Sequence, residues 1–353
     1  MKYRVIQWGT GFVGKLALRA TIEHPDLELV GLVVHGKEKV GRDAGELIGL
    51  DAVGVRATDD VDAAAKIDAD VVSYFANADL RPADAVQDMA RMLAAGKNVV
   101  SSSVVALVYP RSAPPSLVAP LEEACRKGGT SCFTTGIDPG FCNDLIPMTL
   151  MGLTARVDSV RIQEILDYST YPNPETLFSI MGFGQPLDAE PLLLMPGTLT
   201  LAWGSVIYMM AQGLGVKLDG IREVHERRPT PQRLELAVGT VEAGTTAALR
   251  FELQGIVGGT ARIIVEHVTR MHPDVAPEWP RSERGDVYRI LIQGNPSITS
   301  EIAFRGENGD HNTGGCLSTA MRALNAIPAV CAAPPGLLDP FDLPLIPGHH
   351  TMR

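Results

Sequence analysis

Two carboxylates in this sequence are placed to do acid–base chemistry. Asp138 follows a strand expected at 131–135, and ligands collect at the carboxyl ends of strands in open sheets. Glu164 interrupts an apolar set of period two in a strand expected at 157–167, so its side chain should point inward. Among apolar neighbours the pKa of Glu164 would rise toward the working pH, which suits a proton shuttle. Both residues are candidate catalytic groups.

Each carboxylate also has a structural interpretation. Asp138 would stabilise the turn at Pro139-Gly140 through backbone contacts. Glu164 would belong to a buried ion pair, or would face solvent if the strand register differs. The sequence leaves the catalytic and structural roles open for both residues.

Other residues near these carboxylates predict a substrate pocket. Tyr168 and Tyr171 lie in a Pro-rich loop, where their rings would either line a pocket for an apolar ketone or pack in the core. Phe141 and Asn143 follow Asp138 closely and are expected at the same site.

The strongest motif is Gly9-Thr10-Gly11-Phe12-Val13-Gly14, a G-x-G-x-x-G run between an apolar strand and a helix. The first glycine permits a tight turn, the second lets the backbone approach a pyrophosphate, and the third allows close helix–strand packing. The free N–H groups of the first helical turn would face the anion. A second apolar strand over 27–34 completes the unit, so the motif predicts dinucleotide binding rather than a flexible loop.

The end of the second strand indicates which dinucleotide binds. An acidic residue about 20 positions past the glycines would hold a ribose 2′-hydroxyl, and this chain has His35-Gly36-Lys37-Glu38-Lys39 there. Imidazole and ammonium donors would attract a 2′-phosphate, so the sequence favours NADP(H), with His35, Gly36 and Lys37 as contacts. Alternatively, Lys37 and Lys39 are solvated loop charges and NAD(H) is also accepted.

Later strand ends supply further expected cofactor contacts. A fourth strand over 70–77 ends in Ala76 and Asn77, where a cofactor ribose or nicotinamide would pass. Ser101, Ser102 and Ser103 end a fifth strand. These serines would bind the nicotinamide amide or satisfy local backbone groups.

Composition excludes several classes of protein. The 353 residues carry a formal net charge of −10 without a basic stripe, so nucleic acid and anionic membranes are not expected partners. The odd count of five cysteines, without a C-x-x-C pair, predicts reduced thiols in a cytoplasm. The chain begins directly with a strand, which leaves no room for a signal peptide. The apolar segment 192–211 is interrupted by polar residues and predicts a buried helix rather than a membrane span.

Metal chemistry is not expected either. Four histidines late in the chain have neither the spacing nor the accompanying Cys, Asp or Glu of a metal site. They are His267, His272, His349 and His350.

The order of strands and helices predicts two domains. Strand–helix alternation up to residue 135 predicts a Rossmann-like, doubly wound parallel sheet in a dinucleotide-binding domain over 1–145, completed by 313–353. Longer, consecutive strands then predict an α+β domain with an open, mainly antiparallel sheet over 146–312. Hairpin turns are expected at 242–245 and 258–259. The exposed face of this sheet would form a dimer, or a helix at 198–213 would cover it.

Four segments carry a resemblance to a known family. They are Val5–Gly11, Gly96–Ser101, Gly136–Phe141 and Asn325–Val330. The organisation resembles the dihydrodipicolinate-reductase-like superfamily and, over the whole length, the branch of 2,4-diaminopentanoate dehydrogenase and the native amine dehydrogenases. The histidine-rich and lysine motifs of true dihydrodipicolinate reductases are missing, which argues against that reaction.

The resemblance implies hydride transfer between a nicotinamide C4 and an amine or imine carbon. The reaction would be reductive amination of a ketone or aldehyde with ammonia, or its reverse, in a homodimer, with Pro139 beside the nicotinamide. Such enzymes place a glutamate after the fifth strand, where this chain has Val104. Glu164 would replace it. Otherwise the protein is a carbonyl/hydroxyl oxidoreductase, or a non-catalytic NADP(H)-binding sensor.

Overall fold

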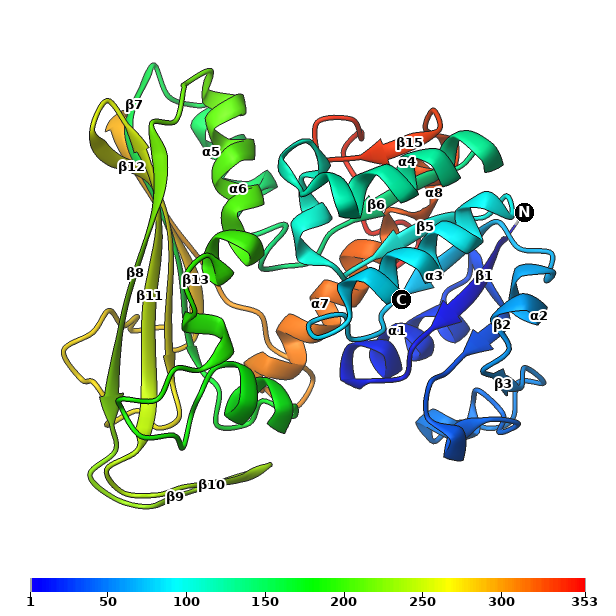
Figure 1. Ribbon diagram of the computed structural model, residues 1–353, viewed down its shortest axis with the longest axis horizontal. Coiled ribbons are helices and arrows are strands. Elements are labelled where there is room, and N and C mark those ends of the chain that lie inside the picture. The colour runs from blue at the N-terminus through cyan, green and yellow to red at the C-terminus, as the bar shows by residue number, and fades with distance from the viewer. Residues whose placement is uncertain (1, 353) are drawn as a thin grey trace. The chain divides into compact units, whose positions relative to one another are not determined.

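The computed structural model describes residues 2–352, which form two compact units (Figure 1). Unit 1 takes the chain up to Ile137 and again from Cys316, and unit 2 takes Asp138–Gly315. Asp138 and the turn that follows it therefore belong to unit 2.

Unit 1 is built on a parallel sheet of seven strands in the order β15-β6-β5-β4-β1-β2-β3. Its strands are β1 (Tyr3–Trp8), β2 (Leu27–Val33), β3 (Ala57–Thr58), β4 (Val71–Tyr74), β5 (Asn98–Ser101), β6 (Ser131–Thr134) and β15 (Gly336–Leu338). The order reverses beside β1, so the expected doubly wound parallel sheet is confirmed. The strand β15 was not expected, because the Pro- and Gly-rich tail gives a weak strand signal. It pairs in parallel with β6 and adds an edge strand to the sheet.

Helices cover both faces of this sheet. They are α1 (Phe12–Glu23), α2 (Val61–Ala65), α3 (Pro82–Ala94), α4 (Pro115–Gly128), α7 (His311–Asn325, in this unit from Cys316) and α8 (Ile327–Ala332). Because side chains alternate along a strand, Ile6 and Trp8 pack with α3 and α4, whereas Val5 packs with α7 and α8. Asp60 caps α2, because its carboxylate accepts from Ala63 N.

Unit 2 is built on a mixed sheet of six strands in the order β14-β13-β7-β12-β11-β8. Its strands are β7 (Arg156–Asp167), β8 (Gly220–Pro229), β11 (Thr246–Val257), β12 (Thr260–Arg270), β13 (Val287–Asn295) and β14 (Ile298–Ile302). All neighbouring pairs are antiparallel except β12 and β7, so the mainly antiparallel sheet is confirmed. The edge strand β8 was missed, because charged residues occupy both of its faces.

Two turn predictions in unit 2 had different outcomes. Gly258 and Gly259 join the antiparallel pair β11 and β12, as expected. The turn at 242–245 does not join paired strands: it leads from β10 (Gly239–Val241), which pairs with β9 (Leu234–Leu236), into β11 of the larger sheet. Turn residues mark a chain reversal, but the pairing of the flanking strands depends on the rest of the fold.

One face of the unit 2 sheet is covered by α6 (Thr198–Leu214), with α5 (Leu145–Met151) near the C-terminal end of α6, as Figure 1 shows. Leu199, Val206, Ile207 and Met210 of α6 are buried in the same core as residues of β11 and β12. None of the described helices has the length and apolar character that crossing a membrane requires. The segment 192–211 thus includes a helix that covers the sheet, as the sequence predicted.

Candidate active site

Strand pairing in unit 2 assembles a buried polar cluster around Glu164. Glu164 on β7 lies directly opposite His267 on the parallel strand β12 and opposite Tyr288 on the antiparallel strand β13. Residues directly opposite each other point to the same face of a sheet. The register therefore places three polar side chains together on the face that also carries the apolar core.

His267 lies between two carboxylates. Its Nδ1 is 3.3 Å from Glu164 Oε1, and its Nε2 is 3.3 Å from Asp138 Oδ1. The side chains of all three residues are at most 5% exposed. Trp203 on α6 donates its indole N–H to Asp138 Oδ1 at 2.6 Å, which holds this carboxylate in place. We call Asp138, Glu164 and His267 the buried triad.

Two tyrosines donate hydrogen bonds to the carboxylate of Glu164. Tyr168 donates to Oε1 at 2.7 Å, and Tyr288 donates to Oε2 at 3.0 Å. Tyr171 stacks on Tyr168, with ring centroids 4.9 Å apart. The tyrosine loop expected near the site therefore does contact a candidate catalytic carboxylate.

The pKa of Glu164 is lowered, which corrects the raised value expected from the sequence. Burial alone would raise the pKa, but the His267 charge and the hydrogen bonds from His267, Tyr168 and Tyr288 outweigh it. The sequence pattern revealed the burial of Glu164 but not the donors that surround it.

The same contacts make His267 the protonated member of the triad. Burial alone would lower its pKa, but the carboxylates of Asp138 and Glu164 raise the pKa of His267 to about 10. At neutral pH the triad is therefore an imidazolium between two carboxylates. Phe251 stacks on the imidazole at a centroid distance of 4.5 Å, and Trp203 meets it edge-on at 4.6 Å. Aromatic rings at these distances fix the ring and favour its charge.

One oxygen of the triad has no partner. Asp138 Oδ2 is buried and accepts no hydrogen bond from any of the described residues. Leaving a buried carboxylate oxygen unpaired is unfavourable, so such an atom marks a place where a ligand N–H or O–H can bind. Asp138 therefore has one buried oxygen that can still accept a hydrogen bond, while its other oxygen contacts Trp203 and His267.

The triad also corrects the expectation that no acidic residue accompanies His267. One ligand atom from each of the three residues lies within 4.8 Å of the others. However, the two imidazole nitrogens lie on different sides of the ring and face different carboxylates. Both oxygens of Glu164 already accept from tyrosines. The arrangement thus suits proton movement better than coordination of a single ion.

The remaining expected substrate residues have different environments. Asn143 is fully buried, and its Oδ1 accepts from Gly140 N at 2.8 Å, so it stabilises the turn after Asp138. Phe141 is partly buried beside it. Asn312, at the start of α7, donates to Asp167 O and Thr170 Oγ1. It thereby anchors the loop that carries Tyr168.

In unit 1, the glycine loop has the geometry of a phosphate-binding turn. Gly9 has φ +92°, and a Cβ there would meet the backbone of Phe75 and Ala76 at 2.8–2.9 Å. A Cβ on Gly14 would come within 2.5 Å of Gly9 O, whereas Gly11 has open space beside it. Since α1 begins at Phe12 without a side-chain cap, its first N–H groups remain available to an anion.

A buried glutamine braces this loop. Gln7 Nε2 donates to the carbonyl oxygens of Gly9 and Gly14, and its Oε1 accepts from Ser73 Oγ at 2.6 Å. This role of Gln7 was not predicted, because a lone polar residue in an apolar strand carries no positional signal.

The strand ends next to β1 carry the other expected cofactor residues. Ser103 Oγ donates to Ala76 O at 2.5 Å, and Ser103 N donates to Ser101 Oγ at 2.9 Å. These two serines satisfy local backbone groups, the alternative that the sequence left open. Ser102 is partly buried, and Asn77 is exposed, with its side chain closing a turn through Asp79 N. Val104 is buried and apolar, so it brings no carboxylate to this edge.

The end of β2 carries His35, Gly36 and Lys37. His35 Nε2 lies 2.9 Å from Arg81 Nη2, and Lys37 pairs with Asp59. The basic groups at this edge of the sheet therefore differ in their partners: Lys37 pairs with a carboxylate, whereas His35 contacts another basic group, Arg81.

A glycine loop of this geometry and a separate buried acid–base cluster define an oxidoreductase that uses a nicotinamide nucleotide. Residues 3–103 match the family model described as dihydrodipicolinate reductase, N-terminus. Residues 141–351 match the model described as 2,4-diaminopentanoate dehydrogenase C-terminal domain. The chain belongs to the family of 2,4-diaminopentanoate and amine dehydrogenases, and it is an enzyme of the NAD(P)-dependent amine dehydrogenase type.

Individual relatives agree over nearly the whole length. The chain is 45% identical to an amine dehydrogenase of Streptomyces virginiae, covering 97% of this chain and 96% of the relative. It is 26% identical to 2,4-diaminopentanoate dehydrogenase of Acetoanaerobium sticklandii, covering 98% and 94%. The fold is similar to the solved amine dehydrogenase of Mycobacterium smegmatis, with a TM-score of 0.79 at 20% identity over 98% and 97% of the two chains.

Proposed function

We propose that this protein catalyses NADP(H)-dependent reductive amination of a ketone or aldehyde with ammonia, and the reverse oxidation of the amine, with Asp138 as the group that exchanges protons with substrate. The observation that carries this proposal is the unpaired, buried Oδ2 of Asp138 beside a protonated histidine. An N–H of ammonia or of an amine is the donor that this oxygen lacks.

The reaction balances with a single proton carrier. One carbonyl, one ammonium ion and one hydride give one amine and one water. Asp138 Oδ2 accepts the proton that ammonium must lose before it attacks, and it returns that proton to the hydroxyl of the carbinolamine, which leaves as water. NADPH, when bound, supplies the hydride that reduces the resulting imine.

The other members of the triad hold Asp138 ready for this exchange. The His267 imidazolium and the Trp203 N–H both face Oδ1, so Oδ2 is directed toward substrate. Glu164, itself held by two tyrosines, faces the opposite nitrogen of the imidazole and stabilises its charge. His267 and Glu164 are therefore positioning residues, and they replace the glutamate absent at Val104.

Substitution within the triad tests these roles. We expect ammonia-dependent loss of NADPH absorbance with a panel of ketones and aldehydes. Asp138→Asn should lower the turnover number by about 100-fold or more, in the range of general acid–base catalysis. Glu164→Gln should lower it less, because Glu164 acts through His267. The affinity for nucleotide, measured by calorimetry, should change in neither variant.

The control is Asp158→Asn, an exposed carboxylate on the same strand as Glu164, which should keep full activity. Carbonyl reduction without ammonia would replace the proposal by a carbonyl/hydroxyl oxidoreductase. Nucleotide binding without oxidation of NADPH by any substrate would identify a sensor protein. Unchanged turnover in Asp138→Asn would remove Asp138 from the chemistry.

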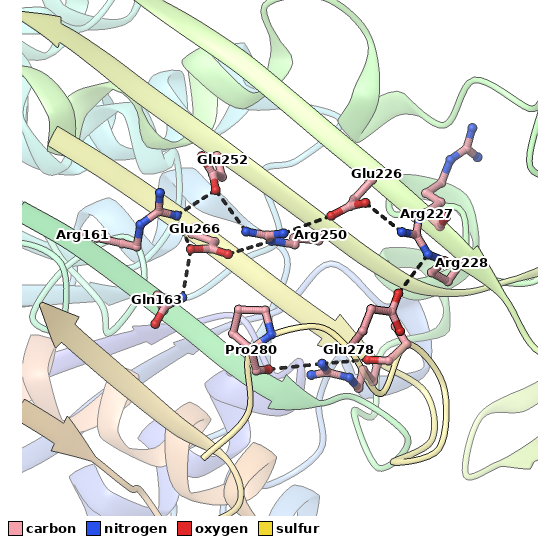
Figure 2. A network of polar contacts seen from close by, with 12 residues as sticks. Arg161, Gln163, Glu226, Arg227, Arg228, Arg250, Glu252, Glu266, Glu278 and Pro280 are labelled. Carbon is pink, nitrogen blue, oxygen red and sulfur yellow. Dashed lines mark hydrogen bonds and ion pairs between the residues drawn. The ribbon is translucent and has the colours of Figure 1, made fainter. Parts of the chain in front are cut away.

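We also propose a cytoplasmic homodimer that forms through the polar face of the unit 2 sheet, the face opposite α6. Among the described residues, none of the five cysteines forms a disulfide, which suits a reducing compartment. Figure 2 shows alternating arginines and glutamates on this face, in which Arg161 and Arg250 both pair with the fully buried Glu266. A surface that carries both charges in a fixed pattern is complementary to a second copy of itself.

A further inference from the structure

A second pair of a histidine and a carboxylate lies in unit 2, outside the buried triad. His311 is 8% exposed, and its Nδ1 lies 3.1 Å from Asp286 Oδ2. The other oxygen of Asp286 accepts from Asp167 N at 2.8 Å, so both carboxylate oxygens are engaged. His311 Nε2 is buried and has no hydrogen-bond partner among residues 2–352. We call these two residues the His311–Asp286 pair.

The carboxylate decides which nitrogen of His311 carries the proton. Burial alone would raise the pKa of Asp286, but the hydrogen bond and charge of His311 and the hydrogen bond from Asp167 N lower it. Asp286 is therefore ionised at neutral pH and can only accept a hydrogen bond, so Nδ1 of His311 is the donor. In the neutral imidazole the lone pair then lies on Nε2. The unpartnered nitrogen is thus a proton acceptor, and it becomes a proton donor once the ring is charged.

The pair is attached to both strands that supply groups to Glu164. Asp286 directly precedes β13, and two residues further on Tyr288 donates to Glu164 Oε2 at 3.0 Å. The backbone N–H that Asp286 accepts belongs to Asp167, the last residue of β7, which also carries Glu164. The position of the pair is therefore fixed by the same strand pairing that assembles the triad.

A loop makes a second connection between the pair and the triad. Asn312, the residue after His311, donates to Asp167 O at 3.1 Å and to Thr170 Oγ1 at 2.7 Å. Thr170 lies two residues after Tyr168, which donates to Glu164. The start of α7 and the tyrosine loop are thus held together. His311 belongs to the part of unit 2 that surrounds the candidate site.

One proton transfer of the proposed reaction still lacks a carrier. Addition of ammonia to a carbonyl gives an adduct with a positive nitrogen and a negative oxygen, and a proton must move from nitrogen to oxygen before water leaves. The carrier has to accept a proton and then release it. His267 cannot accept it, because its pKa of about 10 keeps it protonated at neutral pH. Both oxygens of Glu164 already accept from tyrosines, and Asp138 holds the proton taken from ammonium.

We propose that His311, oriented by Asp286, is a second catalytic residue and moves this proton. His311 Nε2 takes a proton from the positive nitrogen of the adduct, so that an N–H bond breaks and an imidazolium forms beside Asp286. The imidazolium then gives the proton to the alkoxide, which becomes the hydroxyl of the carbinolamine. Nothing is oxidised or reduced in this step and His311 ends neutral, so the overall balance of the reaction is unchanged. The inference rests on the proposed function and adds one residue to it.

The experiment measures ammonia-dependent oxidation of NADPH by the full-length protein and by variants of the pair. His311→Ala should lower the turnover number by about 100-fold or more, in the range of general acid–base catalysis. Added imidazole should restore part of the lost turnover, and more as its concentration rises, because it can occupy the space of the missing ring. Asp286→Asn should lower turnover by about tenfold or more, since an amide N–H facing Nδ1 would leave the proton on Nε2.

The matched control is His225→Ala, which removes an exposed histidine on β8. It should keep full turnover and should not respond to imidazole. The affinity for nucleotide, measured by calorimetry, should stay unchanged in all three variants, which shows that each of them is folded.

Each other outcome overturns the inference in a recognisable way. Unchanged turnover in His311→Ala would remove His311 from the chemistry. A loss of turnover that imidazole does not reverse would mean that His311 only supports the tyrosine loop. Full activity of Asp286→Asn would show that Asp286 does not decide where the proton lies. A wild type without ammonia-dependent activity would overturn the proposed function itself, whereas the first three results would leave that function standing.

Discussion

At the scale of single residues, the protonation of the triad depends on what surrounds each group. Glu164 and His267 are equally buried, yet the pKa of Glu164 falls and that of His267 rises. Burial alone would raise the pKa of Glu164 and lower the pKa of His267, because it disfavours the charged form of each group. The nearby opposite charges and hydrogen bonds outweigh it. The triad is therefore best understood as one ionised unit and not as three separate side chains.

This charge state makes stability depend on pH. The folded pKa of His267, about 10, lies above its ordinary value of 6.5. Its contribution to the free energy of unfolding is therefore fully present below pH 6.5 and is lost as the pH rises toward 10. That contribution is on the order of a few kcal/mol. We expect His267→Gln to lack this alkaline loss of stability in urea unfolding measured across the pH range.

The control for this measurement is His225→Gln, which changes an exposed histidine on β8 and should keep the alkaline loss. If His267→Gln showed the same decline with pH as the wild type, His267 would not be the protonated group. The carboxylates of the triad would then need another counter-charge.

At the scale of elements, different glycines of the glycine loop are needed for folding and for nucleotide binding. Gly14 packs against the Gly9 carbonyl, so the contact is needed in the folded chain itself. Gly11 has nothing within 4 Å of the position where a Cβ would lie. Its lack of a side chain matters only when a pyrophosphate approaches the backbone. One short motif thus contains one glycine for structure and one for ligand.

Alanine substitutions should reveal this difference. Gly14→Ala should lower the unfolding temperature and weaken nucleotide binding, because its Cβ would displace the loop backbone. Gly11→Ala should keep the unfolding temperature and weaken binding by about tenfold or more, since the Cβ would occupy the approach to the pyrophosphate. Calorimetry of binding and thermal unfolding measure the two effects separately.

Gly220→Ala is the matched control, because Gly220 starts β8 with open space around it and should affect neither property. Full nucleotide affinity in Gly11→Ala would show that the pyrophosphate does not approach this backbone.

At the scale of the whole molecule, the polar face of the unit 2 sheet should decide the oligomeric state. Val224 on β8 lies opposite Glu252, a member of the charged network, so it belongs to this face and is 44% exposed. Leu201 is 52% exposed on α6, which covers the other face. Substituting aspartate for each of these exposed apolar residues tests which face of the sheet forms the dimer interface.

We expect the wild type to be a dimer in light scattering coupled to size exclusion. Val224→Asp should weaken dimerisation by about 100-fold or more, because burying an unpaired carboxylate costs several kcal/mol. Leu201→Asp should leave the dimer intact. Dissociation by Leu201→Asp alone would move the interface to the α6 side, and a monomeric wild type would remove the dimer proposal.

The sequence determined what depends on neighbours along the chain. The glycine loop, the strand–helix alternation of unit 1 and the inward direction of Glu164 all follow from local spacing and period. Only the tertiary structure shows that His267 and Tyr288 lie beside Glu164. Strand pairing joins segments about a hundred residues apart, and a local sequence pattern does not reveal which segments will pair. It also added β15 and β8, whose local signals are weak. The sign of the Glu164 pKa shift was decided in the same way, since electrostatic interaction depends on distance in space and not on distance along the chain.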